Sequence, residues 1–227
     1  MQPKFNYGTK KERLMRRLKR LKRRLWTWYN LVSSILSPSY YPVSITLTYA
    51  PAERWESRDI SLFLDRVRRY YKRRGWRFLY FWVAELQQRG AVHYHVVLFV
   101  PKGHMLPKPD LQGWWRKGMT HIMAVEQFAA YFAKYIQKGV QKGVEGDLEF
   151  PKRLRIFGYG GLNDFERGMY RCFWLPYQVR RYLLDVLGVF LVLRKRGGKI
   201  LVSSERGIFS VSYIFLPDTG DFLIRFT

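Results

Sequence analysis

Apolar residues recur along this chain with two different periods, and these periods divide it into predicted helices and strands. Between residues 10 and 36 they recur every three or four positions, which is typical of one long helix. Residues 43–49 alternate apolar with polar side chains and predict a strand, because strand side chains point to opposite faces in turn. A helical period returns over 57–74. Two further strands are predicted over 76–87 and 91–100, which are rich in valine and aromatic residues.

The second half of the chain continues the alternation of strands and helices. The predicted elements are strands at 119–125 and 154–158, a helix at 126–138 that ends at Gly139, and a three-stranded meander over 199–227 with turns at 205–207 and 218–220. A hairpin in the middle of this order favours an antiparallel sheet. We therefore expect an α+β fold, a central antiparallel sheet with packed helices, with a basic N-terminal helix and a C-terminal β meander. The expected division is an arm over 1–37, a main domain over 38–180 and an extension over 181–227.

The charge balance narrows the class of partner. Lysine and arginine total 41 against 17 acidic residues, a formal net charge of +24. Nucleic acid is the leading partner, because neutralised phosphates release counterions and so drive binding; an anionic membrane surface is the weaker alternative. The one cysteine, Cys172, excludes an internal disulfide and a Cys-rich zinc site. No apolar stretch reaches the roughly 18 residues of a membrane span, so we expect a cytoplasmic protein that does not cross a membrane.

The predicted N-terminal helix carries an unusual density of positive charge. Ten basic residues and one acid, Glu12, lie between Lys10 and Arg24. Its apolar residues follow a 4-3-4-3 spacing from Leu14 to Ile35. This pattern leaves two main alternatives open, a helix docked on the main domain with its basic face in solvent, or an arm that contacts DNA. A coiled-coil dimer is a third alternative, because about four heptads are marginal for one.

Two histidines share one face of the strand predicted over 91–100. His93 and His95 stand at i and i+2, so both imidazoles project from the same side. The preceding loop, Gln88–Gly90, has glycine in the third position, where a three-residue hairpin favours the left-handed conformation. That hairpin sets Glu85 opposite His93, at about 5 Å. Glu85, His93 and His95 are therefore expected to converge.

Two imidazoles and a carboxylate suit a divalent cation that keeps open positions for a substrate oxygen. Mg²⁺ or Mn²⁺ is the expected ion, with Zn²⁺ as the alternative. The competing interpretation is structural, since a single strand histidine usually serves packing and Glu85 could form a salt bridge. The alignment of all three residues by an independent turn rule favours metal binding.

The helix predicted over 126–138 presents a stripe of tyrosine and lysine. Tyr131, Lys134, Tyr135 and Lys138 occupy i, i+3, i+4 and i+7. A phenol with a pKa of about 10 is a weak nucleophile, but a metal that polarises a phosphate and a nearby ammonium group would assist its attack. The alternative is an amphipathic helix whose tyrosines lie at the edge of the core.

Taken together, these motifs resemble the HUH endonuclease superfamily, and specifically the rolling-circle replication initiator (Rep) proteins of phages and plasmids. The matching segments are the strand Ser44–Thr48, Glu85 with His93-Tyr94-His95, the helix segment Tyr131–Lys138 and, more weakly, Leu154–Gly158. Their order matters, because initiators place the tyrosines after the histidines and relaxases place them before. The resemblance covers about residues 43–160.

The resemblance implies a ferredoxin-like or RRM-like sheet and a particular reaction. Tyr131 or Tyr135 would attack a phosphodiester of single-stranded DNA at an origin hairpin, giving a 5′-phosphotyrosine link and a free 3′-hydroxyl. Lys134 and Lys138 would stabilise charge or hold phosphate. Because the chain lacks a fused helicase, a separate helicase and the host polymerase are expected partners. A non-catalytic binder of single-stranded nucleic acid, and an HUH transposase or relaxase with the same chemistry, stay open as alternatives.

Overall fold

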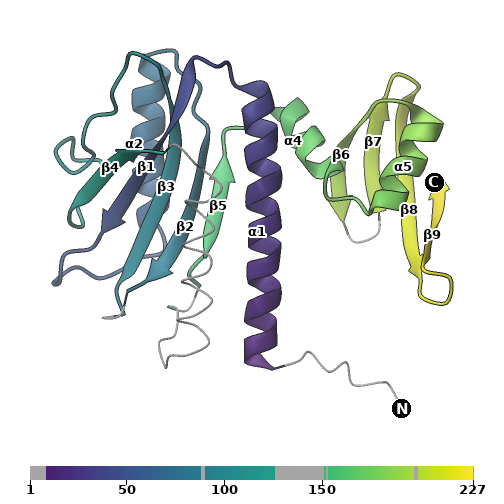
Figure 1. Ribbon diagram of the computed structural model, residues 1–227, viewed down its shortest axis with the longest axis horizontal. Coiled ribbons are helices and arrows are strands. Elements are labelled where there is room, and N and C mark those ends of the chain that lie inside the picture. The colour runs from purple at the N-terminus through teal and green to yellow at the C-terminus, as the bar shows by residue number, and fades with distance from the viewer. Residues whose placement is uncertain (1–8, 88–89, 126–150, 152, 197–198, 227) are drawn as a thin grey trace. The chain divides into compact units, whose positions relative to one another are not determined.

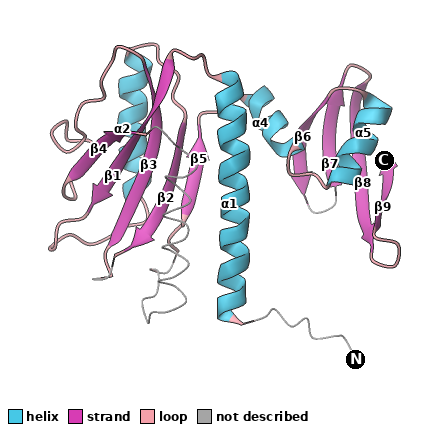
Figure 2. Cartoon of the chain, in the orientation of Figure 1, coloured by secondary structure: helices cyan, strands magenta, loops and turns pink. Residues whose placement is uncertain are grey.

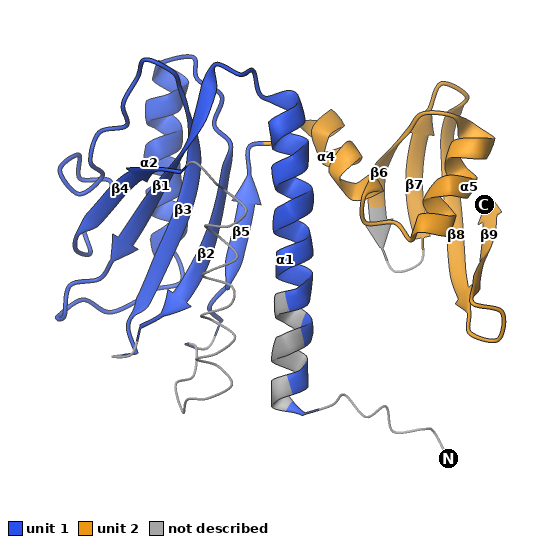
Figure 3. Cartoon of the chain, in the orientation of Figure 1, with its two compact units in different colours: residues 1–161 blue, residues 162–227 orange. Residues whose placement is uncertain are grey.

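The computed structural model describes residues 9–87, 90–125, 151, 153–196 and 199–226 (Figure 1). The chain forms two compact units, residues 1–161 and residues 162–227 (Figure 3). The first unit contains a five-stranded sheet, and the second contains a four-stranded sheet.

The sheet of the first unit has the order β4-β1-β3-β2-β5, and every neighbouring pair is antiparallel. Its strands are β1 (Tyr40–Thr48), β2 (Tyr80–Leu86), β3 (Val92–Pro101), β4 (Thr120–Ala124) and β5 (Phe157–Gly160). Strands β1 and β3 pair over nine residues, from Tyr40 opposite Pro101 to Thr48 opposite His93. This antiparallel sheet with packed helices confirms the expected α+β fold.

Helix α2 (Asp59–Arg73) packs on one face of this sheet (Figure 2). Its apolar positions recur at helical spacing, so Phe63 and Val67 lie on the stripe that faces the sheet, and both are fully buried. The strand residues of the same core include Ile45, Trp82 and Tyr94. Because side chains alternate along a strand, the neighbours of these residues are left to the other face of the sheet.

Helix α1 (Lys10–Ile35) begins and ends close to the expected positions. A capping box starts it, in which the Thr9 hydroxyl accepts from the Glu12 backbone and the Glu12 carboxylate accepts from the Thr9 backbone. The helix ends just before Ser37-Pro38, since a residue that precedes proline disfavours helical backbone.

From Leu21 onwards α1 is docked on the first unit. Its buried residues are Leu21, Leu25, Trp28, Leu31 and Val32. The Trp28 ring lies 5.7 Å from that of Phe81 and 5.9 Å from that of Phe99, between ring centroids. The face of α1 away from this contact carries exposed cations that include Lys19 and Arg20. This part of the helix therefore matches the docked alternative, and its apolar side is not available for a coiled-coil partner.

The second unit contains the expected C-terminal meander and three further elements. Its elements are α4 (Asp164–Cys172), α5 (Tyr177–Leu187), β6 (Phe190–Arg196), β7 (Lys199–Ser204), β8 (Gly207–Leu216) and β9 (Asp221–Phe226). The four strands follow one another in the sheet in chain order, all antiparallel. Buried residues of α5, such as Val179 and Leu183, form a core with Val192, Val202 and Val211 of the sheet.

Three details differ from the expectations or lie beyond them. Strand β5 begins at Phe157 rather than at residue 154, because Leu154 closes a turn with a hydrogen bond from its N–H to the Pro151 carbonyl. The compact units divide the chain after Gly161, and α4 and α5 pack with the C-terminal strands. The helix expected over 126–138 lies outside the described residues. No helix in the described ranges carries an apolar run long enough to cross a bilayer.

Candidate metal centre

The hairpin that joins β2 to β3 has the expected register. The Gln87 N–H donates to the Ala91 carbonyl at 2.9 Å, and the Gly90 N–H donates to the Gln87 carbonyl at 3.0 Å. Gly90 has a φ of 79°, the left-handed conformation that glycine adopts without steric cost. The ladder then pairs Glu85 with His93, as the three-residue loop predicts. One short turn therefore determines which residues meet across the two strands.

Glu85, His93 and His95 lie on one face of the sheet, opposite the face that α2 covers. Their exposed fractions are 7%, 8% and 4% respectively, so all three polar side chains are buried. The His95 Nε2 atom lies 2.9 Å from a Glu85 carboxylate oxygen. The two imidazole centroids are 6.4 Å apart. Burial of such polar groups is costly unless they are paired or bind an ion, so this cluster calls for a chemical role.

A fourth residue, Thr46, joins the cluster from β1. Its Oγ1 lies 3.3 Å from Nδ1 of His95, and the ladder sets Thr46 directly opposite His95. Both ring nitrogens of His95 therefore have a partner, the hydroxyl on one side and the Glu85 carboxylate on the other. A fixed second nitrogen orients an imidazole and sets its tautomer. Sequence analysis did not assign this residue, although its strand alternation was visible.

The donor types of this cluster fit a divalent cation, because a carboxylate oxygen and two neutral imidazole nitrogens are ligands of Mg²⁺, Mn²⁺ or Zn²⁺. In the conformation described, the Glu85 carboxylate contacts the nitrogen of His95 that would bind an ion. Accordingly, no group of three or more His, Cys, Asp or Glu side chains in the described ranges is gathered closely enough to hold a metal. Binding through all three residues would require the contact between Glu85 and His95 to open.

The other two histidines lie away from this cluster. His121 pairs with Thr46 on the outer side of β1, so it is two strands from His95, a separation of about 10 Å. His104 packs its ring against Trp76, with centroids 4.9 Å apart. Neither histidine is close enough to contact an ion held by Glu85.

The expected nucleophile and its helpers, Tyr131, Tyr135, Lys134 and Lys138, lie outside the described residues. The structure therefore brings together only that half of the expected site which is predicted to bind metal.

A comparison with protein families adds an independent observation. Residues 42–140 match the family described as replication-associated protein ORF2. The matched segment contains β1 to β4, with Glu85 and both histidines, and extends through the tyrosine-lysine sequence. It spans less than half of the chain, and it supports a role in replication. Neither the curated proteins nor the solved structures searched contain a match to this chain.

Proposed function

We propose that this protein is a rolling-circle replication initiator that nicks and rejoins single-stranded DNA at an origin. The observation that carries the proposal is the buried Glu85, His93 and His95 cluster within a segment similar to a replication-associated family. In the proposed reaction the hydroxyl oxygen of Tyr131 or Tyr135 forms a bond to phosphorus, and the bond from phosphorus to the 3′ oxygen breaks. The products are a 5′-phosphotyrosine link and a DNA 3′-hydroxyl, and rejoining reverses both bonds.

The chain's own residues would divide this work between two segments. Glu85, His93 and His95 would hold a divalent ion, Mg²⁺ or Mn²⁺, while Thr46 keeps the His95 ring in place. A bound ion supplies Lewis-acid polarisation of the scissile phosphate. Lys134 and Lys138 would hold phosphate and offset the charge that develops on its oxygens. Two tyrosines four positions apart would allow the first to attack and the second to accept the next strand.

The proposed partners follow from this reaction. The substrate is a single-stranded or hairpin origin in the host cytoplasm, reached by a strongly basic chain. Unwinding and synthesis would depend on a separate helicase and on the host polymerase.

The test is the capture of the covalent intermediate. The full-length protein is incubated with Mn²⁺ and labelled single-stranded oligonucleotides of origin-like sequence, and the products are separated on a denaturing gel. We expect a labelled band at the mass of the protein plus DNA. The band should be absent without divalent metal and in the double variant Tyr131→Phe/Tyr135→Phe, but present in the control Tyr177→Phe, which alters an exposed tyrosine of the second unit. A band that persists in the double variant would show the mechanism to be wrong.

A non-catalytic binder of single-stranded nucleic acid is the second candidate. The exposed cations of docked α1 and the net charge of +24 favour it, because a basic surface binds phosphates without catalysis. This candidate predicts tight, salt-sensitive binding with no covalent product under any metal condition. The same gel therefore separates the two functions.

A further inference from the structure

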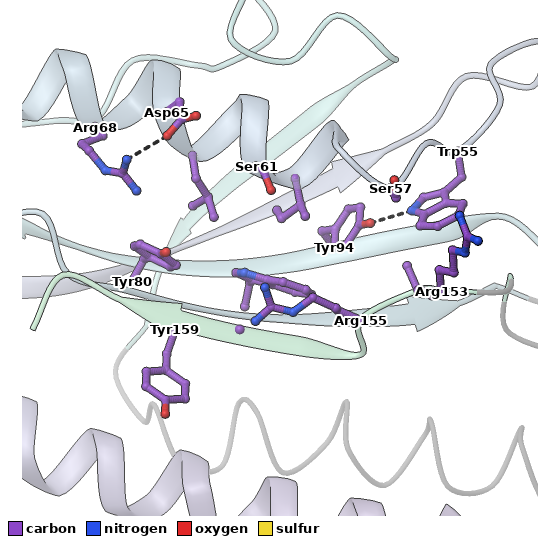
Figure 4. A pocket seen from close by; sticks show the side chains of 15 residues that line it. Trp55, Ser57, Ser61, Asp65, Arg68, Tyr80, Tyr94, Arg153, Arg155 and Tyr159 are labelled. Carbon is purple, nitrogen blue, oxygen red and sulfur yellow. Dashed lines mark hydrogen bonds and ion pairs between the residues drawn. The ribbon is translucent and has the colours of Figure 1, made fainter. Parts of the chain in front are cut away.

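The first unit contains a cavity on the face of its sheet opposite Glu85 and the histidines. The cavity measures about 270 Å³ and lies between α2, the β2 and β5 strands and the segment 153–155 (Figure 4). Trp55, Tyr80, Trp82 and Tyr94 contribute aromatic walls. Its volume is close to the lower limit of about 300 Å³ for small-ligand sites, so it suits a single compact group.

Two glycines of β5 shape the aromatic wall. A Cβ atom at Gly158 would lie 2.6 Å from the indole of Trp82, and one at Gly160 would lie 2.5 Å from the Tyr80 hydroxyl. The rings of these β2 residues therefore extend across β5, where any side chain would displace them. Tyr159, between the glycines, projects from the other side of the strand (Figure 4). The alternation of glycine with tyrosine keeps one face of the edge strand open for the rings.

The opposite end of the cavity is fixed by a hydrogen bond. The Trp55 Nε1–H donates to the Tyr94 hydroxyl at 2.7 Å (Figure 4). Tyr94 is buried, whereas Trp55 and Tyr80 are only partly buried. The two partly exposed rings are therefore the ones that a ligand can reach.

The cavity carries more positive than negative charge. The guanidinium carbon of Arg155 lies 5.8 Å from the centre of the Trp82 ring, so the stacked group keeps its edge N–H donors for a ligand. Among the described residues, the side chains of Arg153 and Arg155 make no hydrogen bond or ion pair. The carboxylate that lines the cavity, Asp65, is paired with Arg68 at 2.8 Å. Within the described part of the chain, these two exposed arginines are thus left without an acidic partner.

The backbone at Arg153 is a second, independent observation. Its φ is 68°, a left-handed conformation that no other non-glycine residue of the described ranges adopts. It lies in the turn that the hydrogen bond from Leu154 to Pro151 closes, where glycine or asparagine would fit without strain. A strained residue that persists beside a cavity points to a use for its side chain.

We propose that this cavity binds one nucleotide of single-stranded DNA, with the base against Trp55 and Tyr80 and the phosphate on Arg153 and Arg155. Aromatic faces bind bases of any sequence, and arginine binds phosphate through paired N–H donors. The site is separate from the proposed catalytic cluster, since β2 and β3 side chains alternate between the two faces. It would hold a strand that passes from one face of the sheet to the other.

The test compares two double variants of the full-length protein with equal loss of charge. Arg153→Gly/Arg155→Gln changes the cavity and relieves the strained backbone, whereas Lys72→Gln/Arg73→Gln removes exposed charges at the end of α2. Affinity for short labelled oligothymidine is measured by fluorescence anisotropy. We expect the cavity variant to bind about tenfold more weakly than the control variant, because stacking and phosphate contacts are both lost. An equal loss in both variants would overturn the proposal.

Photocrosslinking gives the location of the base. Oligonucleotides with 5-iodouracil are irradiated with the protein, and the crosslinked peptides are identified by mass spectrometry. Crosslinks at Trp55 or Tyr80 that disappear in the cavity variant support the site, and crosslinks confined to other peptides contradict it. Competition with thymidine monophosphate distinguishes the source of the nucleotide: full displacement at matched concentration indicates a free nucleotide, and weak displacement indicates a DNA strand.

Failure of this proposal is distinguishable from failure of the proposed nicking function. The cavity variant should still form the covalent adduct at saturating DNA, because it leaves Glu85, the histidines and both tyrosines intact. The Tyr131→Phe/Tyr135→Phe variant should lose the adduct and keep the wild-type anisotropy and crosslinks.

Discussion

His95 is held from both sides of its ring, and this arrangement decides how the cluster can bind a cation. Nδ1 faces the Thr46 hydroxyl and Nε2 faces the Glu85 carboxylate. If Nδ1 donates its proton to Thr46, Nε2 has a lone pair that can bind an ion together with the carboxylate. The Thr46 hydroxyl thereby favours the tautomer that binds metal.

Replacement of Thr46 tests this orientation. Thr46→Val keeps the shape and the strand preference of the residue, so the fold should be retained, but we expect about tenfold weaker binding of Mn²⁺. Thr46→Ser keeps the hydroxyl and should bind Mn²⁺ within a few-fold of wild type. Titration of the metal by calorimetry measures both variants. Equal affinity of the valine variant and wild type would show that the hydroxyl has no role in binding.

The strand pattern and the hairpin rule were enough to identify Glu85 as the partner of His93, because both depend on nearby residues. Thr46 could not be assigned in the same way, since its place opposite His95 follows from the pairing of β1 with β3 across 49 positions of sequence. Local patterns do not determine which distant strands become neighbours. The arginines of the cavity were missed for a similar reason, because Arg155 meets Trp82 only after β5 pairs with β2.

At the level of elements, α1 combines two properties that the sequence left as alternatives. Its apolar side is buried in the first unit, and cations remain exposed on other sides. Trp28 is completely buried between Phe81 and Phe99, while Trp26, two residues earlier, is 55% exposed. The docking of the helix therefore depends on one of these two tryptophans.

Substitution of each tryptophan should separate packing from composition. Trp28→Ala should lower the free energy of unfolding by about 3–5 kcal/mol, because it leaves a cavity against the sheet. Trp26→Ala, on the exposed side, should change it by less than about 0.5 kcal/mol. Urea unfolding followed by circular dichroism provides both values. Similar losses in the two variants would mean that the helix is not held by Trp28.

The helices that sequence analysis missed show where local patterns were underused. Asn163 caps α4, and Glu166 returns the contact to the Asn163 backbone, so a capping box was present in the sequence. The adjoining segment from Leu183 to Leu193 contains the end of α5 and the start of β6, with Gly188 between them. A short apolar run of this kind does not reveal its division by hydropathy alone.

For the molecule as a whole, the pH dependence of stability should be determined by buried phenols in the first unit. Burial raises the pKa of Tyr94 to about 12, and it raises the pKa of Tyr49 and Tyr71 well above the usual value of about 10. An acid whose folded pKa is raised stabilises the fold below its unfolded pKa, and this contribution is lost as pH rises through the folded pKa. Stability should therefore be constant up to about pH 10 and fall towards pH 12.

A tyrosine-to-phenylalanine pair tests this expectation. The Tyr71 hydroxyl is buried and has no hydrogen-bond partner among the described residues, so Tyr71→Phe should be at least as stable as wild type at pH 7. It should also lose less stability between pH 10 and about pH 12. Tyr177→Phe, at a position that is 65% exposed, should match wild type throughout. Urea midpoints measured across this pH range would show whether the curves separate as expected.

The tight turn between β2 and β3 has a consequence for how this chain can change in evolution. A shift of the ladder by one residue would move Glu85, His93 and His95 to the α2 side together and bring Tyr94 to the opposite side. An insertion within either strand is therefore an all-or-none event, because it exchanges a polar cluster for an apolar core in one step. Length variation among natural homologues should accordingly be absent between Glu85 and His95, while point substitutions on the exposed surface accumulate freely.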